Sequence, residues 1–116
     1  MEICFEGIGQ TAATFRAEGE IHPGMTVTLV KSGTVGPGED GDELCGVALG
    51  SARGGAVAVQ MGGAAKVCCS GTSAPGVGWQ SLVCDGKGGV KTAGTGGVKW
   101  LVLTVDAENK NAVIKL

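Results

Sequence analysis

Short apolar runs rich in valine alternate with polar breaks rich in glycine along the whole chain. Within the runs, as in 25–31 and 56–61, apolar and polar residues alternate or β-branched residues recur, which is typical of β-strands. No long stretch spaces its apolar residues at helical intervals, and each interior glycine would weaken a helix by about 1 kcal/mol. The pattern therefore predicts an all-β fold, a small barrel or tight sandwich of about eight to ten short strands.

The breaks between the runs place these strands along the chain. Pairs such as Gly54-Gly55 and Gly62-Gly63 mark turns, because glycine adopts a positive φ without steric cost. The polar segment 32–42 is predicted to be an exposed hairpin or flap around Thr34 and Val35, and 70–78 is predicted to be a hinge. The strands are predicted at 14–17, 25–31, 44–49, 56–61, 65–69, 80–84, 90–92, 99–105 and 112–116.

The chain also nearly repeats itself. Residues 24–30 (GMTVTLV) are echoed at 78–83 (GWQSLV), and 47–61 are echoed at 102–116. A repeated strand–turn–strand unit in so short a chain predicts one pseudo-symmetric β-domain. We expect this domain to span 14–116, with half-repeats at 20–69 and 77–116, and to follow an N-terminal arm at 1–13.

Composition and charge narrow the possible partners. Glycine contributes 23 of the 116 residues, yet 43% of the chain is hydrophobic, which favours a folded domain over a disordered one. The net charge is −2, the charged residues are scattered along the sequence without a Lys/Arg cluster, and aromatic side chains are few. Binding of nucleic acid needs basic patches and stacking platforms, so we predict no nucleic-acid partner.

The N-terminus and the apolar runs indicate where in the cell the protein is made. Residues 1–6 carry acids where a signal peptide would carry bases, and no apolar run approaches the roughly 20 residues of a membrane span. We therefore expect no membrane partner, and synthesis in the cytoplasm.

Several residues with possible chemistry are assigned structural roles. The five cysteines are odd in number and form no CxxC pair, and His22 is the only histidine, so we predict free thiols and neither a disulfide framework nor a metal site. We expect His22 in an exposed turn and 39–43 (EDGDE) in a solvated flap. The glycine-rich segments at 33–38 and 86–89 do not open a helix and are predicted to be hairpin turns, not phosphate loops. We predict no catalytic residue and no cofactor.

The apolar residues of the arm and the two tryptophans are the candidate partner-binding residues. Trp100 lies in the apolar run 98–105 and is predicted to pack in the core, whereas Trp79 either covers the core or forms an interface. The arm contains Ile3, Phe5 and Ile8 without an obvious partner strand. We predict that it adds a strand to a sheet edge of a partner or of a neighbouring subunit.

Three segments together resemble a family of tailed-phage proteins. Residues 20–27 (EIHPGMTV), 44–49 (LCGVAL) and 54–67 (GGAVAVQMGGAAKV) are similar to the capsid cement or head-decoration proteins, long known only as a domain of unknown function. Cys45 stands where the family has an aromatic residue, and Met25 and Ala56 stand where it has acids. The resemblance covers most of 14–69, with a looser echo to the end.

The resemblance implies a non-enzymatic virion protein. It implies that the chain binds the major capsid protein on the outer surface of the assembled shell and stabilises that shell, as a homo-oligomer and often a trimer. It also implies synthesis in the bacterial cytoplasm from a phage or prophage gene. The family has no catalytic residues to transfer.

Two other classes stay open from the sequence. One is a small β-barrel that binds a ligand or acts as an enzyme, which needs a pocket with convergent polar groups. The other is a bacterial adaptor module unrelated to phage. A biotin- or lipoate-carrier domain is disfavoured, because no lysine lies in 70–78 between the halves.

Overall fold

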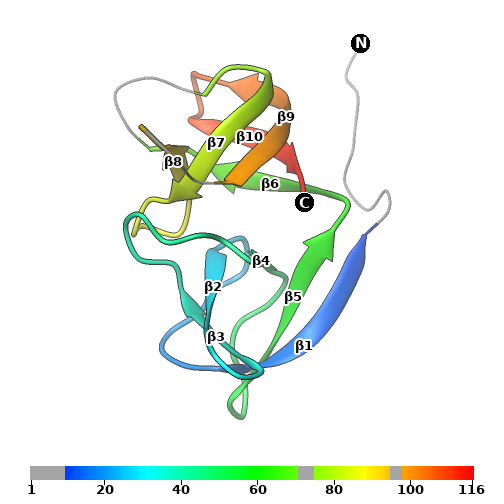
Figure 1. Ribbon diagram of the computed structural model, residues 1–116. Coiled ribbons are helices and arrows are strands. Elements are labelled where there is room, and N and C mark those ends of the chain that lie inside the picture. Colours follow the sequence, from blue (N-terminus) through cyan, green and yellow to red (C-terminus); the bar gives the residue numbers. More distant parts are fainter. Residues whose placement is uncertain (1–9, 71–74, 95–97) are drawn as a thin grey trace.

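The structure is a computed structural model, and it describes residues 10–70, 75–94 and 98–116. Ten strands form two five-stranded sheets, one above the other in Figure 1, and the described residues include no helix. The predicted all-β fold is confirmed. In chain order the strands are β1 (Thr11–Ala17), β2 (Thr26–Lys31), β3 (Thr34–Pro37), β4 (Gly46–Ala48), β5 (Ala56–Gly62), β6 (Ala64–Cys68), β7 (Gly78–Cys84), β8 (Val90–Thr92), β9 (Val98–Asp106) and β10 (Asn111–Lys115).

The first sheet closes on itself as a barrel. Its strand order is β1-β3-β2-β4-β5, and β1 closes the barrel by pairing antiparallel with β5 and parallel with β3. Its interior is filled by small branched side chains because a five-stranded barrel has little internal space. The buried residues of this barrel core are Ile21, Val27, Val35, Ala48, Val57 and Val59.

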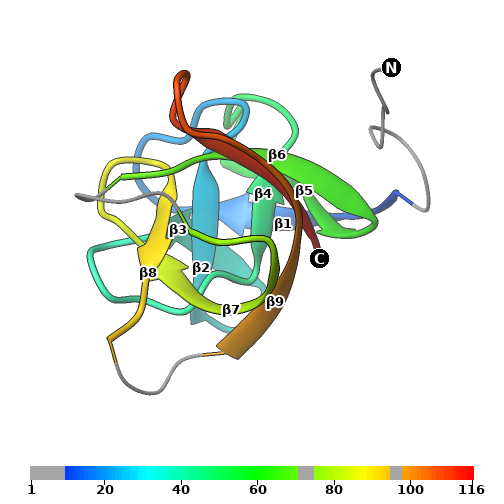
Figure 2. The same ribbon diagram turned by 90° about the horizontal axis from the view of Figure 1, so that it is seen from above.

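The second sheet has the order β6-β10-β9-β7-β8, and its long strands are strongly curved (Figure 2). A parallel bridge between Cys69 and Val90 ties its two ends together. The core beneath it takes Leu44 and Val47 from the first half of the chain, in addition to residues of the sheet itself. The two lobes are also joined by the buried Thr26 hydroxyl, which donates to the Gly89 carbonyl at 2.8 Å.

The two sheets have the same topology, which confirms the predicted pseudo-repeat. Each strand from β1 to β5 has a counterpart five strands later in the same place of the second sheet. Equivalent hydrogen bonds recur: the Ala17 N–H donates to the Gly55 carbonyl, and the Cys69 N–H donates to the Lys110 carbonyl. The chain passes from the barrel to the second sheet at Gly63, between β5 and β6. The predicted hinge at 70–78 therefore lies within the second sheet, between β6 and β7.

The sequence match of 24–30 with 78–83 is wrong by one residue. Leu29 pairs with Val35 and Cys84 pairs with Val90, so Leu29 corresponds to Cys84 and Val27 to Leu82. Val27 and Leu82 are both fully buried. A shift of one residue turns every side chain of a strand to the opposite face, so burial fixes the register that the similarity of letters missed.

The segment 32–42, predicted to be an exposed hairpin or flap, contributes to a hairpin of β2 and β3, but the predicted exposure is wrong for much of it. Its residues 34–37 form β3, which is largely buried and pairs with both β1 and β2. The following loop packs on β7, where the Cys84 N–H donates to the Asp42 carbonyl at 2.8 Å. Gly38 is required there, because a Cβ at this position would overlap the Cys84 side chain.

The N-terminal boundary of the first strand also differs. Residues 11–13, predicted to be part of the arm, lie in β1 and pair with β5. Residues 1–9 lie outside the described part of the chain. The described residues contain no helix that could span a membrane.

Replacing Lys110 by glycine is expected to raise the free energy of unfolding by about 0.5–1 kcal/mol. Lys110 has a φ of 55° and takes the place that Gly55, with a φ of 77°, takes in the first half. A left-handed backbone costs a lysine about 1–2 kcal/mol, from which the larger unfolded-state entropy of glycine, about 0.5–1 kcal/mol, is subtracted. Urea denaturation of the variant measures the change. The reverse variant, Gly55→Lys, is expected to be less stable, and a loss of stability in Lys110→Gly would contradict the argument.

Candidate partner-binding face

The outer face of the second sheet carries an exposed tryptophan in a row of paired residues. Trp79 of β7 pairs with Leu101 of β9, and Leu101 pairs in turn with Lys115 of β10. Directly paired residues in an antiparallel sheet share a face, so these three side chains lie side by side. Trp79 is 65% exposed, which is unusual for the largest apolar side chain. It therefore does not cover the core.

Lysines surround this row on the same face. Lys99 pairs with Ser81, two residues along β7 from Trp79, and Lys66 pairs with Val113, two residues along β10 from Lys115. Lys91 of β8 pairs with Val83, also on this face, and its ammonium forms an ion pair with Asp40 at 2.5 Å. The face thus combines an aromatic and aliphatic centre with a cationic rim.

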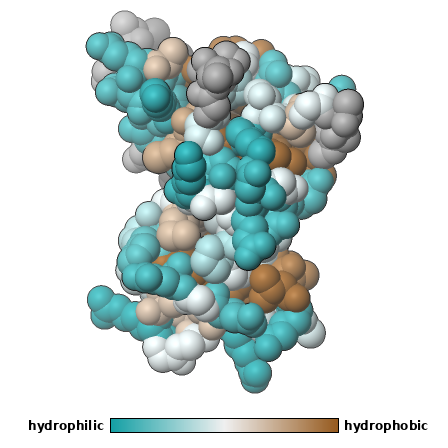
Figure 3. Space-filling model, turned by 90° about the vertical axis from the view of Figure 1, so that its left-hand side faces the viewer, coloured by the Kyte–Doolittle hydropathy of each residue, from teal (hydrophilic) through white to brown (hydrophobic). Residues whose placement is uncertain are grey.

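This grouping of lysines on one face is not apparent from the sequence, in which the charged residues are scattered. Residues 64–116 contain six lysines and three carboxylates, whereas 1–63 contain three cationic side chains and eight carboxylates. The imbalance between the halves is visible in the sequence, but which lysines share a face depends on strand register. Figure 3 shows one side of the molecule, where hydrophilic side chains cover most of both lobes and hydrophobic ones lie in separate patches.

The other candidate residues lie elsewhere. Trp100 is partly buried and packs against the core of the second sheet, as predicted, and among the described residues its indole Nε1 has no hydrogen-bond partner. Ile3, Phe5 and Ile8 lie outside the described residues, so the structure does not bring them together with Trp79, and their role stays a prediction.

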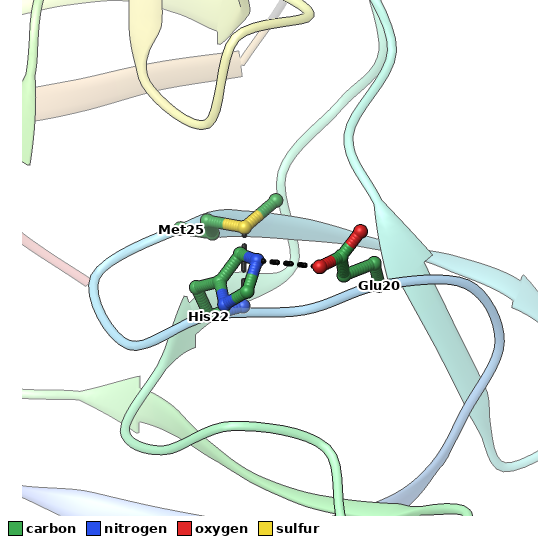
Figure 4. Close-up of polar contacts among 3 residues, drawn as sticks. All are labelled: Glu20, His22 and Met25. Atoms are coloured by element: carbon green, nitrogen blue, oxygen red, sulfur yellow. Dashed lines mark hydrogen bonds and ion pairs between the residues drawn. The ribbon is translucent and has the colours of Figure 1, made fainter.

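His22 lies in an exposed turn, as predicted (Figure 4). Its Nε2 is 3.1 Å from the Glu20 Oε1, and its backbone N–H donates to the Met25 Sδ at 3.2 Å. Pro23 and Gly24, with a φ of 85°, are the central residues of this turn, which the Met25 N–H closes on the His22 carbonyl. Among the described residues, the hydrogen-bond partner of the imidazole is the exposed Glu20 carboxylate.

The described cysteines Cys45, Cys68, Cys69 and Cys84 are free, as predicted, and Cys4 lies outside the described residues. Burial raises the pKa of the Cys45, Cys69 and Cys84 thiols, which keeps them protonated and unreactive at neutral pH.

Aspartate side chains in the loops accept hydrogen bonds from backbone N–H groups. The Asp85 Oδ1 accepts hydrogen bonds from the N–H groups of Lys87 at 2.7 Å and Gly89 at 2.9 Å. Asp42 likewise accepts from the Glu39 N–H at 3.1 Å. Hydrogen bonds from Asn109 lower the pKa of Asp106 in the turn between β9 and β10. Among the described residues, no three His, Cys, Asp or Glu side chains are grouped so that they could hold a metal ion.

Comparison with known proteins places the fold. No protein-family model matches the chain, and no curated protein matches it. Among solved structures, the chain is similar to the N-terminal base of the head fiber protein gp8.5 of bacteriophage phi29. The TM-score is 0.64 at 15% sequence identity, over 92% of this chain and 93% of that chain. At this identity the likeness establishes a shared fold, that of a phage head-fiber base.

Proposed function

We propose that this chain is a non-enzymatic structural protein of a phage or prophage virion, which binds the outer surface of the assembled capsid shell and stabilises it. The observation that carries the proposal is the fold shared with a phage head-fiber base over almost the full length of both chains. The resemblance of 20–27, 44–49 and 54–67 to capsid cement proteins rests on sequence motifs and does not depend on the fold. Both likenesses concern proteins of the phage head.

The proposed partner is the major capsid protein, and the proposed contact is the face around Trp79. Interfaces between proteins are enriched in exposed aromatic side chains surrounded by a polar rim, and tryptophan is a frequent hot spot. The lysines around Trp79 and Leu101 favour a shell surface rich in carboxylates. We further propose that the chain assembles as a homo-oligomer, a trimer in the family that it resembles, and that it is made in the bacterial cytoplasm without a cofactor.

Two measurements together test the proposed function. Quantitative mass spectrometry of virions induced from the source bacterium is expected to find this chain at a copy number comparable to that of the major capsid protein. Shells produced without the chain are expected to bind the purified protein saturably in co-sedimentation and to withstand higher temperature afterwards. Absence of the protein from intact virions, together with no binding to shells, would overturn the proposal.

A further inference from the structure

A groove of about 580 Å³ lies between the barrel and the edge of the second sheet. Its apolar part is formed by Val47, Ala48 and Leu49 on the barrel side and by Ala64 and Ala65 at the start of β6. Gln60 fixes the corner between β5 and β6, because its Nε2 donates to the carbonyls of Gly62 and Ala64, each at 3.0 Å. These two hydrogen bonds hold the turn at one end of the groove.

One wall of this groove is an open strand edge. In the described chain, β6 pairs with β10 on one side and on the other side has only the bridge of Cys69 to Val90. The Gly63 carbonyl and the Cys69 N–H both bond toward β10, so the odd-numbered residues of β6 face β10. The backbone groups of Lys66, like the N–H groups of Ala64 and Cys68, point to the open edge. An unpaired edge of this kind accepts an added strand.

The described part of the chain begins at this groove. Gln10 lines it, and Figure 1 shows the N-terminal end of β1 beside the corner between β5 and β6. Thr11 pairs antiparallel with Gly62, whereas Ala12 pairs with Gln60, so Met61 is skipped in the ladder. Because Met61 is skipped, the backbone groups that point toward β1 and its extension belong to odd-numbered residues in β5 and to even-numbered residues in β6. The ladder can therefore continue along β6 without a further shift.

We propose that residues 5–9 of the same chain occupy the groove as a strand that extends β1 antiparallel along β6. In the register set by Thr11 and Gly62, Gly9 is opposite Ala64, Gly7 opposite Lys66, and Phe5 opposite Cys68. The backbone groups of the odd-numbered arm residues then bond to the unpaired backbone groups of β6. Odd-numbered residues also bond in this direction in β1, where the Ala17 N–H donates to the carbonyl of Gly55, just before β5.

The sequence of residues 5–9 suits this position in the groove. Ile8 falls opposite Ala65, over the apolar part of the groove, and glycines on both sides of it allow a close approach of the backbones. Five residues match the length of β6, which also has five. The occupant is the chain's own arm because its tether starts at the groove, and the effective concentration of a segment tethered by a short linker is in the millimolar range. This assignment replaces the prediction that the arm adds a strand to a partner or a neighbouring subunit, and it does not depend on shell binding through the face around Trp79.

Residue-resolved hydrogen exchange of the full chain tests this inference. The Lys66 N–H is expected to exchange as slowly as the Val67 N–H, which bonds to β10. Deletion of residues 2–9 is expected to accelerate exchange at Lys66 by about 100-fold and at Val67 by less than about threefold, because only the first loses its partner. Fast exchange of Lys66 in the full chain, or slow exchange that survives the deletion, would overturn the inference.

Two matched variants test the register. Ile8→Ser is expected to accelerate exchange at Lys66, whereas Ile3→Ser, beyond the end of the added strand, is expected to leave it unchanged. Equal effects of the two variants would contradict the register. If protection of Lys66 rises with protein concentration over about a 100-fold range and dimers appear in light scattering, the strand comes from a second copy and the own-chain assignment is wrong.

Discussion

Truncation of Leu82 to alanine is expected to lower the free energy of unfolding by about 3 kcal/mol, the largest loss that we expect from a single truncation in this chain. Leu82 of β7 lies in the core of the second sheet and is fully buried. Large-to-small substitutions at such sites cost about 2–5 kcal/mol, because the apolar transfer energy is lost and a cavity remains. A domain of this size is stable by only about 5–15 kcal/mol, so the loss is a large fraction of the total.

The same variant tests whether 14–116 unfold as one unit, which we propose. Leu44 and Val47 of the first half lie in the second core, and the Thr26 hydroxyl bonds across to Gly89, so loss of one lobe exposes groups of the other. Urea unfolding is followed by tryptophan fluorescence, which reports the second lobe because both tryptophans lie there, and by far-ultraviolet circular dichroism, which reports both lobes. In Leu82→Ala both transitions are expected to move together to lower urea.

The matched control for Leu82→Ala is Leu29→Ala. Leu29 occupies β2, the counterpart of β7, but its side chain is 57% exposed, so the change is expected to stay within about 0.5 kcal/mol. A second dichroism transition in Leu82→Ala, at the urea concentration of the unmodified protein, would show that the barrel unfolds separately. Equal losses in the two variants would contradict the assignment of the core.

The strands themselves could be predicted because their cause is local. The run 56–61 is apolar except for Gln60, has a β-branched valine at 57 and 59, and ends at Gly62-Gly63, and the structure places β5 at Ala56–Gly62. The same holds for β10, predicted at 112–116 and found at Asn111–Lys115. The repeat was visible for the same reason, since equivalent strands need similar alternation and similar turns.

Pairing partners could not be predicted in this way. The segment 32–42 is predicted to be an exposed hairpin or flap because its glycines and proline suit a loop, yet Thr34 and Val35 pair with β1, far away in the sequence. Its glycines serve close packing: a Cβ on Gly36 would lie 3.2 Å from the Glu18 carbonyl oxygen. The lysine rim could not be predicted for a related reason, because its lysines come from four strands and only the register brings them onto one face.

The face around Trp79 is expected to dominate binding to the shell, which rests on the proposed function. Trp79→Ala is expected to weaken binding of the protein to shells by about 30-fold or more, the loss typical of a hot-spot aromatic residue. Its side chain is 65% exposed in the free protein, so the truncation removes contact area without opening the core, and stability is expected to change by less than about 0.5 kcal/mol. Co-sedimentation over a range of protein concentrations measures the affinity.

The lysine rim is expected to affect the rate of binding to the shell and the dependence of the affinity on salt. Lys99→Glu and Lys115→Glu are expected to slow association and to reduce the dependence of affinity on salt, because charges at a rim act mainly on the encounter with a partner of opposite charge. Leu29→Ala, another exposed apolar residue but on the barrel, is the matched control and is expected to bind within about threefold of the unmodified protein. If Leu29→Ala weakened binding while Trp79→Ala did not, the shell would contact the barrel, and the proposed function would stand with a different interface.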